Sequence, residues 1–427
     1  MGMTAGEKIL AKASGLDRVS PGDVVYPDPE LVICHDGYIA SSKEQLDDLG
    51  IDRVFDPDRI LLVTDHTVLY TTQAHAERGA AIRKAARDWG IRNFLDVGNT
   101  AQGHVYPIEK GLVLPGTFAF ANDMHCTNNG AVGALVMRTG PEIISVFATG
   151  TMWVEVPQTV RINLHGTLPE GVLSRDLGFV LARGFTDGTF GAEWDYRIIE
   201  CGGAGVDALS AEQRVPLCNT LTEIGVCNVF FEPNADIIDA ARTVAQRPFT
   251  PVYSDADAHY EAVIDFDLSQ LTPQLALPGS PDRAVSIEGH EGRAVDHAVV
   301  GSCGSCMYSD MEIVARTLQG NRVAPGTRLF VAPGTQAITA RMRREGLIDI
   351  LQDAGAILLP PGCGPCAGGQ MAPMAPGEVS ISTVATNTAG RMGAADSDIY
   401  LASPATVAAS AIKGQITDPR RVAECAA

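Results

Sequence analysis

Short apolar segments alternate with helix-like segments along the chain, and this alternation constrains the fold most. The run DRILLVTD (58–65) is apolar in its middle and polar at its end, as is typical of a buried strand. The next segment, TQAHAERGAAIRKAARDWG (72–90), has a helical composition and closes at Gly90. RNFLDVG (92–98) then reads as another strand. This order predicts an α/β fold, in which helices cover the faces of a largely parallel sheet.

The same alternation continues to the end of the chain. Residues 260–289 lose helical periodicity and gain proline and glycine, so we expect a connection there that leads into a last α/β domain near residue 290. Helices are expected at 210–225, 335–346 and 403–414. Further strands are expected at 142–150, 160–166, 228–234, 297–302, 328–334 and 356–362.

Length and charge narrow the function classes. The 427 residues suggest about three domains. The 51 acidic residues outnumber the 32 basic ones, which gives a net charge of −19 and disfavours nucleic-acid and membrane partners. No apolar run reaches the roughly 18 residues that span a bilayer, and the N-terminus lacks a signal-peptide pattern. Ten cysteines without an export signal indicate reduced thiols and a cytoplasmic location.

Two C-x-x-C pairs, Cys303/Cys306 and Cys363/Cys366, are the strongest chemical signal. A four-cysteine zinc site fits the paired spacing, and a thioredoxin-like redox pair would need a helix after the motif, which Pro365 and later prolines oppose. An iron–sulfur cluster held by thiolates on strand-end loops is the third interpretation. The segment GCGPCA (362–367) matches G-x-G-x-x-A formally, but no helix is expected after it, so we reject a dinucleotide site.

Histidines next to carboxylates form a second signal. Asp65 and His66 end one expected strand, and Asp123 and His125 precede CTNNGAVGAL. His104 lies in AQGHVYPIE. Acid–base catalysis needs imidazoles that carboxylates orient, so these pairs are candidates, with a structural hydrogen-bonding role as the alternative.

Together the motifs resemble those of the aconitase superfamily, most closely the separate large subunits of isopropylmalate isomerase and homoaconitase. The matching stretches run almost from end to end. They are EKILAKASG with VSPGDVV, CHDG, TDHTV, GHVYPIEKGLVLPGT, DMHCTNNGAVGAL, ATGTMWVEVPQTVRINLHGTLPEGVLSRD, GSC, GCGPC, GEVSISTVATNTAGRMG and YLASPATVAASAIKGQITDPR. The resemblance implies three α/β/α domains around a cluster-binding cleft, without the swivelling fourth domain. We place these domains at 1–130, 131–289 and 290–427.

The resemblance also implies a cofactor and a reaction. In this family three cysteines hold a [4Fe–4S] cluster whose fourth iron binds the substrate hydroxyl and a carboxylate as a Lewis acid. The family removes water from a hydroxy di- or tricarboxylate and can add it back at the neighbouring carbon. The matching thiols here are Cys303, Cys363 and Cys366, and Arg391 matches an arginine that binds a substrate carboxylate. The implied imidazole–carboxylate pairs are His66 with Asp65, His125 with Asp123, and His104 with Glu200.

Several positions depart from the family pattern. One substrate arginine is lost, so we expect a more apolar pocket and a substrate with fewer or differently placed carboxylates. We expect Cys306 not to be a ligand, because Cys363 and Cys366 already supply the family's pair. Where the family commonly has Thr-Asn-Ser after the first cysteine, this chain has Gly304, Ser305 and Cys306. Where the family has Ser-Asn-Arg before its second arginine, this chain has Val384, Ala385 and Thr386. The family's Asp-Ser-His-Thr is replaced by Asp123-Met124-His125-Cys126.

A partner is expected as well. In this family a serine on the swivelling domain abstracts the proton, and we expect this chain, which ends with ITDPRRVAECAA, to lack that domain. We therefore expect a separate small subunit that carries the serine, and little activity without it. The alternative interpretation is a non-catalytic metal-binding protein. It would hold either a structural zinc ion or a closed cluster, in which the fourth iron also has a protein ligand and cannot bind substrate.

Overall fold

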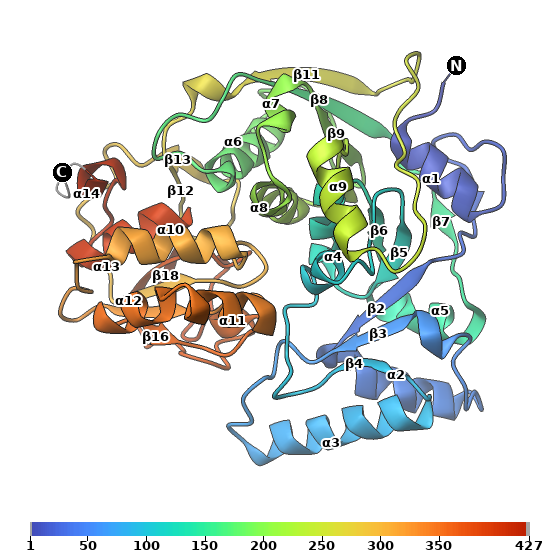
Figure 1. Cartoon of the computed structure of the whole chain (residues 1–427), viewed down its shortest axis with the longest axis horizontal. Helices are drawn as coiled ribbons and strands as arrows, with labels where there is room; N and C mark the ends of the chain where they lie inside the picture. The colour runs from blue at the N-terminus through green and yellow to red at the C-terminus, as the bar shows by residue number, and fades with distance from the viewer. Residues whose placement is uncertain (1, 424–427) are drawn as a thin grey trace. The chain divides into compact units, whose positions relative to one another are not determined.

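Three sheets of four or more strands organise the chain. The computed structural model (Figure 1) describes residues 2–423. These residues divide into two units. Unit 1 comprises residues up to 164 with 192–211 and 225–266, and unit 2 comprises 165–191, 212–224 and the residues from 267. No helix within the described part of the chain is long and apolar enough to cross a membrane.

The first sheet of unit 1 has five parallel strands in the order β4-β3-β2-β5-β6. Both faces are buried, because alternate residues of β2 enter two different apolar clusters: Val32 and Cys34 one, Leu31 and Ile33 the other. Helices α2 (Asp36–Asp48), α3 (Gln73–Asp88) and α5 (Ile143–Thr149) contribute to the first cluster, and Figure 1 shows α2 and α3 beside the strands. The strands are β2 (Leu31–His35), β3 (Ile60–Val63), β4 (Asn93–Leu95), β5 (Phe118–Ala121) and β6 (Leu135–Arg138).

The second sheet of unit 1 has four strands in the order β10-β9-β8-β11. Its members β8, β9 and β10 are parallel. A separate two-stranded ribbon pairs β1 (Val24–Val25) with β7 (Val154–Glu155). The strands of the second sheet are β8 (Thr159–His165), β9 (Ile198–Gly202), β10 (Asn228–Phe231) and β11 (Ala262–Asp267).

The sheet of unit 2 has seven strands in the order β13-β12-β18-β17-β14-β15-β16. The five strands from β18 to β16 are parallel, and β12 and β13 are antiparallel additions. The strands are β12 (Gln274–Ala276), β13 (Ala284–Ser286), β14 (His297–Val300), β15 (Arg328–Val331), β16 (Ile357–Leu358), β17 (Val379–Ser382) and β18 (Asp398–Ala402).

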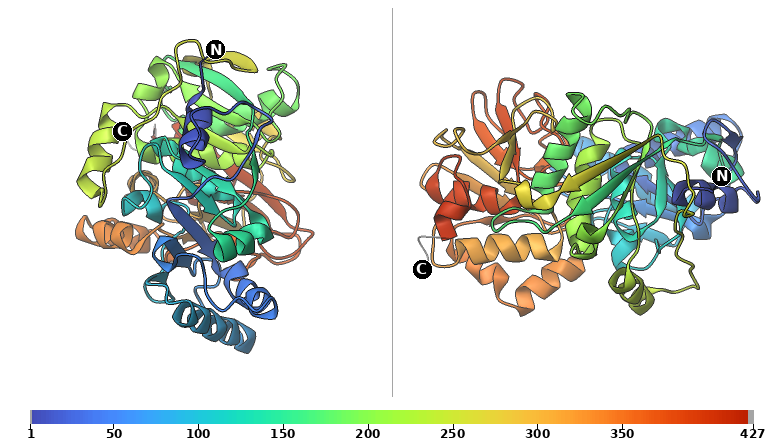
Figure 2. Two further views of the ribbon diagram at one scale, coloured as in Figure 1. Left: turned by 90° about the vertical axis from the view of Figure 1, so that its right-hand side faces the viewer. Right: turned by 90° about the horizontal axis from the view of Figure 1, so that it is seen from above.

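Helices cover one face of this sheet, and the cysteine-bearing loops share the other. The first face packs in one apolar cluster with the helices α10 to α13, of which the orange ones lie along one side of the strands in the right-hand view of Figure 2. The opposite face shares a cluster with Cys303, Cys366 and Phe179 of α6 (Ser174–Thr186). The four helices are α10 (Tyr308–Leu318), α11 (Gln336–Arg344), α12 (Leu347–Asp353) and α13 (Pro404–Lys413).

The α/β class and most predicted elements are confirmed. The expected helices correspond to α3, α8 (Ala211–Thr222), α11 and α13, and all predicted strands but one are present. The remaining helices are α1 (Ala5–Ala13), α4 (Tyr106–Glu109), α7 (Ala204–Asp207), α9 (Ala235–Val244) and α14 (Arg420–Ala423). The domain boundaries at 130 and 289 stay a prediction.

Two expectations about local structure are wrong. The segment 142–150 forms helix α5 and not a strand: it buries Ile143, Val146 and Phe147 at helical spacing and ends at Gly150 with φ of +87°. The segment 260–289 is also more than a connection. It contributes β11 to the second sheet of unit 1 and β12 and β13 to the sheet of unit 2. β12 and β13 have three residues each and are too short to show a period of two in the sequence.

Candidate functional site

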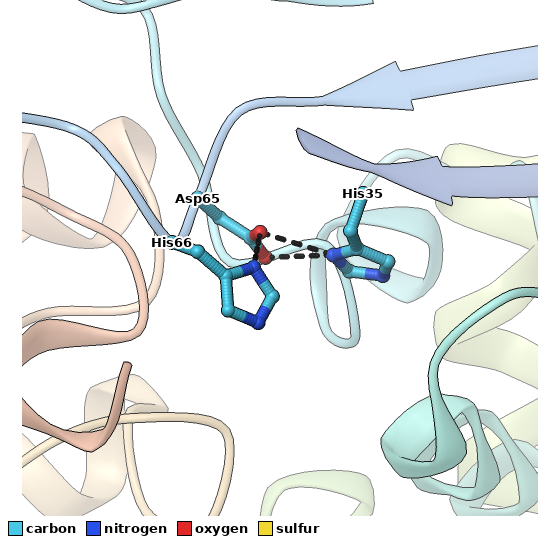
Figure 3. Close-up of side chains that lie close together, drawn as sticks. All are labelled: His35, Asp65 and His66. Atoms are coloured by element: carbon cyan, nitrogen blue, oxygen red, sulfur yellow. Dashed lines mark hydrogen bonds and ion pairs between the residues drawn. The ribbon is translucent and has the colours of Figure 1, made fainter. Parts of the chain in front are cut away.

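An imidazole–carboxylate group lies where two neighbouring parallel strands of unit 1 end. His35 is the last residue of β2, Asp36 opens α2, and Asp65 and His66 follow β3. Nδ1 of His35 lies 3.0 and 3.1 Å from the two oxygens of Asp65, and Nδ1 of His66 lies 2.8 Å from Oδ1 of Asp65 (Figure 3). Oδ1 of Asp36 approaches Nδ1 of His66 to 3.1 Å. The predicted pairing of His66 with Asp65 is confirmed.

The charge of Asp65 is stabilised despite complete burial. Burial by itself raises the pKa of Asp65, but the charges and hydrogen bonds of His35 and His66 lower it far below its ordinary value. Burial lowers the pKa of His35, and Asp65 outweighs this effect, so that the net pKa is raised. The backbone N–H of Gly103 also donates to Oδ2 of Asp65 over 2.8 Å. The group is therefore an ion pair held in a fixed geometry.

A second group in unit 1 surrounds Asp123, which follows β5. Nε2 of His104 lies 3.1 Å from Oδ1 of Asp123, and Nδ1 of His125 lies 3.3 Å from the same oxygen. Asp123 also accepts the backbone N–H of His125 over 3.0 Å as the N-cap of a 3₁₀ helix at Met124–Val132. Burial and the neighbouring charge of His35 lower the pKa of His104 to about 4. His104 is therefore neutral near pH 7.

Stacked imidazoles join the two groups. The rings of His35 and His104 lie 4.3 Å apart at an angle of 29°. Both side chains are about 1 % exposed. Nε2 of His35 and Nδ1 of His104 have no hydrogen-bond partner among the described residues. One imidazole of the pair carries the charge because two cations stacked in an apolar interior would repel each other.

Glu200 contacts a different set of residues from the one expected. The prediction that it pairs with His104 is wrong: His104 pairs with Asp123. Glu200, in the middle of β9, accepts hydrogen bonds from Nη1 of Arg161 over 2.7 Å, from Oγ of Ser254 over 2.8 Å and from the hydroxyl of Tyr260 over 2.7 Å. The side chains come from separate strands and loops, and the sequence shows no local signal for this pairing.

Sequence reasoning also missed His35 and Asp36 as site residues. Both lie in the motif CHDG at the end of a strand that is buried along its whole length: His35 is its last residue and Asp36 follows it. The position after a parallel strand was the available signal, since the carboxyl ends of neighbouring strands converge at one sheet edge. His125 is confirmed as a contact of Asp123.

In unit 2 the four predicted thiols are buried on loops that follow parallel strands. Cys303 and Cys306 follow β14. Cys363 is the N-cap, and Cys366 the last residue, of a one-turn 3₁₀ helix after β16. Gly301 and Ser302 shape the first loop with φ of +134° and +59°, and the Thr383 hydroxyl bonds both backbone groups of Gly301. Ser302 is strained, because a side chain disfavours positive φ, and it lies in the turn that leads into Cys303.

The thiols have donors around them and are spread apart. Nδ2 of Asn219 lies 3.2 Å from Sγ of Cys303, and Nη2 of Arg391 lies 3.5 Å from Sγ of Cys366. The charge of Cys366 raises the pKa of Arg391 against the opposing effect of burial. Within residues 2–423, no three cysteine sulfurs lie within 4.8 Å of one another. A tetrahedral zinc ion with bonds of about 2.3 Å would bring its ligands to roughly 3.8 Å from one another, closer than any three of these sulfurs come together.

Comparisons with known proteins match nearly the whole chain to one family. A sequence model of the aconitase family (aconitate hydratase) matches residues 7–293 and 288–414. The large subunit 1 of 3-isopropylmalate dehydratase from Methanopyrus kandleri is 38 % identical over 422 residues, 98 % of this chain and 99 % of that protein. The large subunit from Halothermothrix orenii is 38 % identical over 424 residues, 99 % of this chain and all of that protein. The solved structure of Thermococcus kodakaraensis aconitase X (holo-form) aligns with a TM-score of 0.50 at 13 % identity over 89 % of each chain, a likeness of fold.

Proposed function

Because the chain belongs to the aconitase family, we propose that it is the cluster-bearing large subunit of a two-subunit hydro-lyase. The observation that carries the proposal is the thiol set of unit 2, buried, spread apart and contacted by an amide and a guanidinium. The relatives that match over nearly their full length are named large subunits of 3-isopropylmalate dehydratase. We propose the same reaction class here, the dehydration of a hydroxy acid.

The cofactor of the proposed enzyme is a [4Fe–4S] cluster. Cys303, Cys363 and Cys366 would hold it, and Asn219 and Arg391 would donate hydrogen bonds to its sulfur ligands. When bound, the cluster supplies a Lewis-acid iron for the substrate hydroxyl. Cys306 is buried beside Cys303 and Cys363, and burial together with their charges raises its pKa well above the ordinary value. Cys363 and Cys366 already supply the ligand pair that the family uses, so we propose that Cys306 is not a ligand and that the cluster stays open.

The acid–base work of the proposed reaction belongs to unit 1. His66 is 26 % exposed at its side chain, whereas Asp65 and Asp36 beside it are buried. The two carboxylates fix its Nδ1, so the proton given to the leaving hydroxyl would be carried on Nε2. His104, Asp123 and His125 would support this group as a second imidazole–carboxylate set. Glu200 would orient the site through Arg161 and would not act on His104.

The substrate we propose is a hydroxy di- or tricarboxylate of the isopropylmalate or homoaconitate type, with fewer or differently placed carboxylates. Val384 and Ala385 belong to the same apolar cluster as Cys303 and Cys366. These apolar side chains cannot bind a carboxylate. Arg391 would therefore bind a substrate carboxylate through the N–H groups that do not point toward Cys366. If ordinary isopropylmalate proved the best substrate, this view of an altered pocket would be wrong.

The proposed partner is a small subunit with a swivelling domain, whose serine would abstract the substrate proton. Closure of that domain over the reacting groups would exclude water. Nucleic acid and membranes are not proposed as partners, and the cytoplasmic location stays a prediction.

The test is anaerobic purification followed by measurement of iron, acid-labile sulfide and zinc per chain. We expect close to four irons with matching sulfide, and a three-iron EPR signal after mild oxidation. Cys363→Ser should lower the iron content, and Cys227→Ser, a half-buried cysteine of unit 1, serves as the control. Zinc without sulfide would refute the enzyme proposal.

Two further measurements separate the alternatives. The closed-cluster alternative predicts that Cys306→Ser creates an oxidation-labile iron that the wild type lacks, whereas we expect equal iron content and lability. Addition of a matching small subunit should raise dehydration activity from near zero on a panel of hydroxy acids. A chain that is fully active alone would exclude the proposed division of labour.

A further inference from the structure

Arg175 is a fully buried arginine of unit 2 without a carboxylate partner. It lies in the first turn of α6 and is 0 % exposed. Nη1 donates to the carbonyl of Gly304 over 3.1 Å and Nη2 to the carbonyl of Val384 over 2.5 Å. Nε has no hydrogen-bond partner among the described residues. Buried arginines are normally paired with a negative charge, so this guanidinium requires an explanation.

The negative groups that act on Arg175 identify its counterpart. The thiol of Cys303 exerts the largest attraction on its charge, followed by Asp310, Cys366 and Glu223. Both hydrogen bonds of the guanidinium within the described residues go to backbone carbonyls and not to a carboxylate. The guanidinium lies over the ring of Phe179, with Cζ of Arg175 at 5.2 Å from the ring centroid. The guanidinium thus contacts the residue that follows Cys303 and is attracted by negative groups that include two of the proposed cluster ligands.

The loop that carries Cys303 is adapted to this guanidinium. Gly304 follows Cys303 directly, and a Cβ atom built on it would lie 2.4 Å from Nη1 of Arg175 and 2.6 Å from the carbonyl oxygen of Thr383. Any other residue at 304 would displace the guanidinium. The absent side chain at position 304, one of the departures from the family pattern, is therefore explained by Arg175.

We propose that Arg175 is the buried counter-charge and positioning residue of the thiolate set. It balances the negative charge that Cys303 and Cys366 acquire on binding the cluster, and its two carbonyl contacts hold the segments around Gly304 and Val384. This inference rests on the proposed function for the presence of the cluster. A [4Fe–4S]²⁺ core with three thiolates has a net charge of −1, and a positive charge beside it in an apolar interior favours the more negative, reduced state.

The test is the midpoint potential of the cluster in the anaerobically purified full chain. Arg175→Gln removes the charge and should shift the potential to a more negative value. Arg175→Lys keeps the charge, loses the paired carbonyl contacts, and should leave the potential close to that of the wild type. The control is Arg183→Gln on the same helix, where Nη1 of Arg183 donates to the carbonyl of Ala284 over 3.0 Å, and no shift is expected.

Each outcome either supports or refutes the counter-charge role of Arg175. If Arg175→Gln holds the cluster with an unchanged potential, or if both Arg175 variants shift the potential equally, the counter-charge role is refuted. If Arg175→Gln fails to fold or to hold iron, Arg175→Lys decides alone: full iron at a near-native potential supports the role, and loss of the cluster or a clearly shifted potential refutes it. A wild type without iron and sulfide would instead refute the proposed cofactor, and with it this inference.

Discussion

Replacing Asp65 with asparagine should destabilise unit 1 by about 3 kcal/mol near pH 6, the lower end of what removing one partner of a buried ion pair costs. The two oxygens of Asp65 accept hydrogen bonds from three nitrogen donors, which belong to His35, His66 and Gly103. An asparagine side chain has the same shape as Asp65 and keeps one oxygen as an acceptor. Its NH₂ group, however, would lie against a buried N–H of one of these three residues. One unsatisfied buried donor alone costs about 1–3 kcal/mol.

The loss should depend on pH with a defined sign. The pKa of His35 is raised from its ordinary 6.5, so its charge stabilises the fold below that pH, and the contribution is lost as pH rises through the folded-state value. The pKa of Asp65 is lowered from its ordinary 3.8, so its contribution is present above that pH and is lost as pH falls through the folded-state value. The effect of Asp65→Asn is therefore greatest between 3.8 and 6.5 and decreases toward alkaline pH.

Urea unfolding followed by tryptophan fluorescence measures this loss selectively. All three tryptophans, Trp89, Trp153 and Trp194, lie in unit 1. Asp47→Asn is the control, because exposed Asp47 pairs with Lys43 one turn away and should contribute less than about 0.5 kcal/mol. A loss below about 1 kcal/mol near pH 6, or an equal loss near pH 6 and pH 9, would contradict the description of Asp65 as the centre of a buried ion pair.

Two other changes probe unit 1. Glu200→Gln should cost about 2 kcal/mol in the same urea assay, because Arg161 loses one of its two carboxylates while the shape is kept; a change within error would mean that the charge of Glu200 is immaterial. His35→Asn should raise the pKa of His104 above about 4, because the charge of His35 is one of the causes that lower it. Carbon-13 NMR of labelled histidines measures this pKa, and an unchanged value would show that the stacked rings do not interact.

The sequence by itself determined the α/β class, most strands and helices, the thiols of the two C-x-x-C motifs and the pairings of His66 with Asp65 and of His125 with Asp123. These features are local: they depend on periodicity, on residues at most three apart, or on motifs that stay together along the chain. The family resemblance added the cofactor and the roles that remain to be tested.

Only the tertiary structure decided which distant residues meet. Parallel pairing of β2 with β3 brings His35 to Asp65, thirty positions apart. The packing of unit 1 also brings His104 into contact with Asp123, nineteen positions away. Glu200 contacts Arg161 instead of His104. Partner choice depends on which strand ends share a sheet edge, and that information is not contained in any local window of sequence. The buried Arg175 beside Gly304 is the clearest case, because each residue explains the other only when α6 and the loop after β14 are packed together.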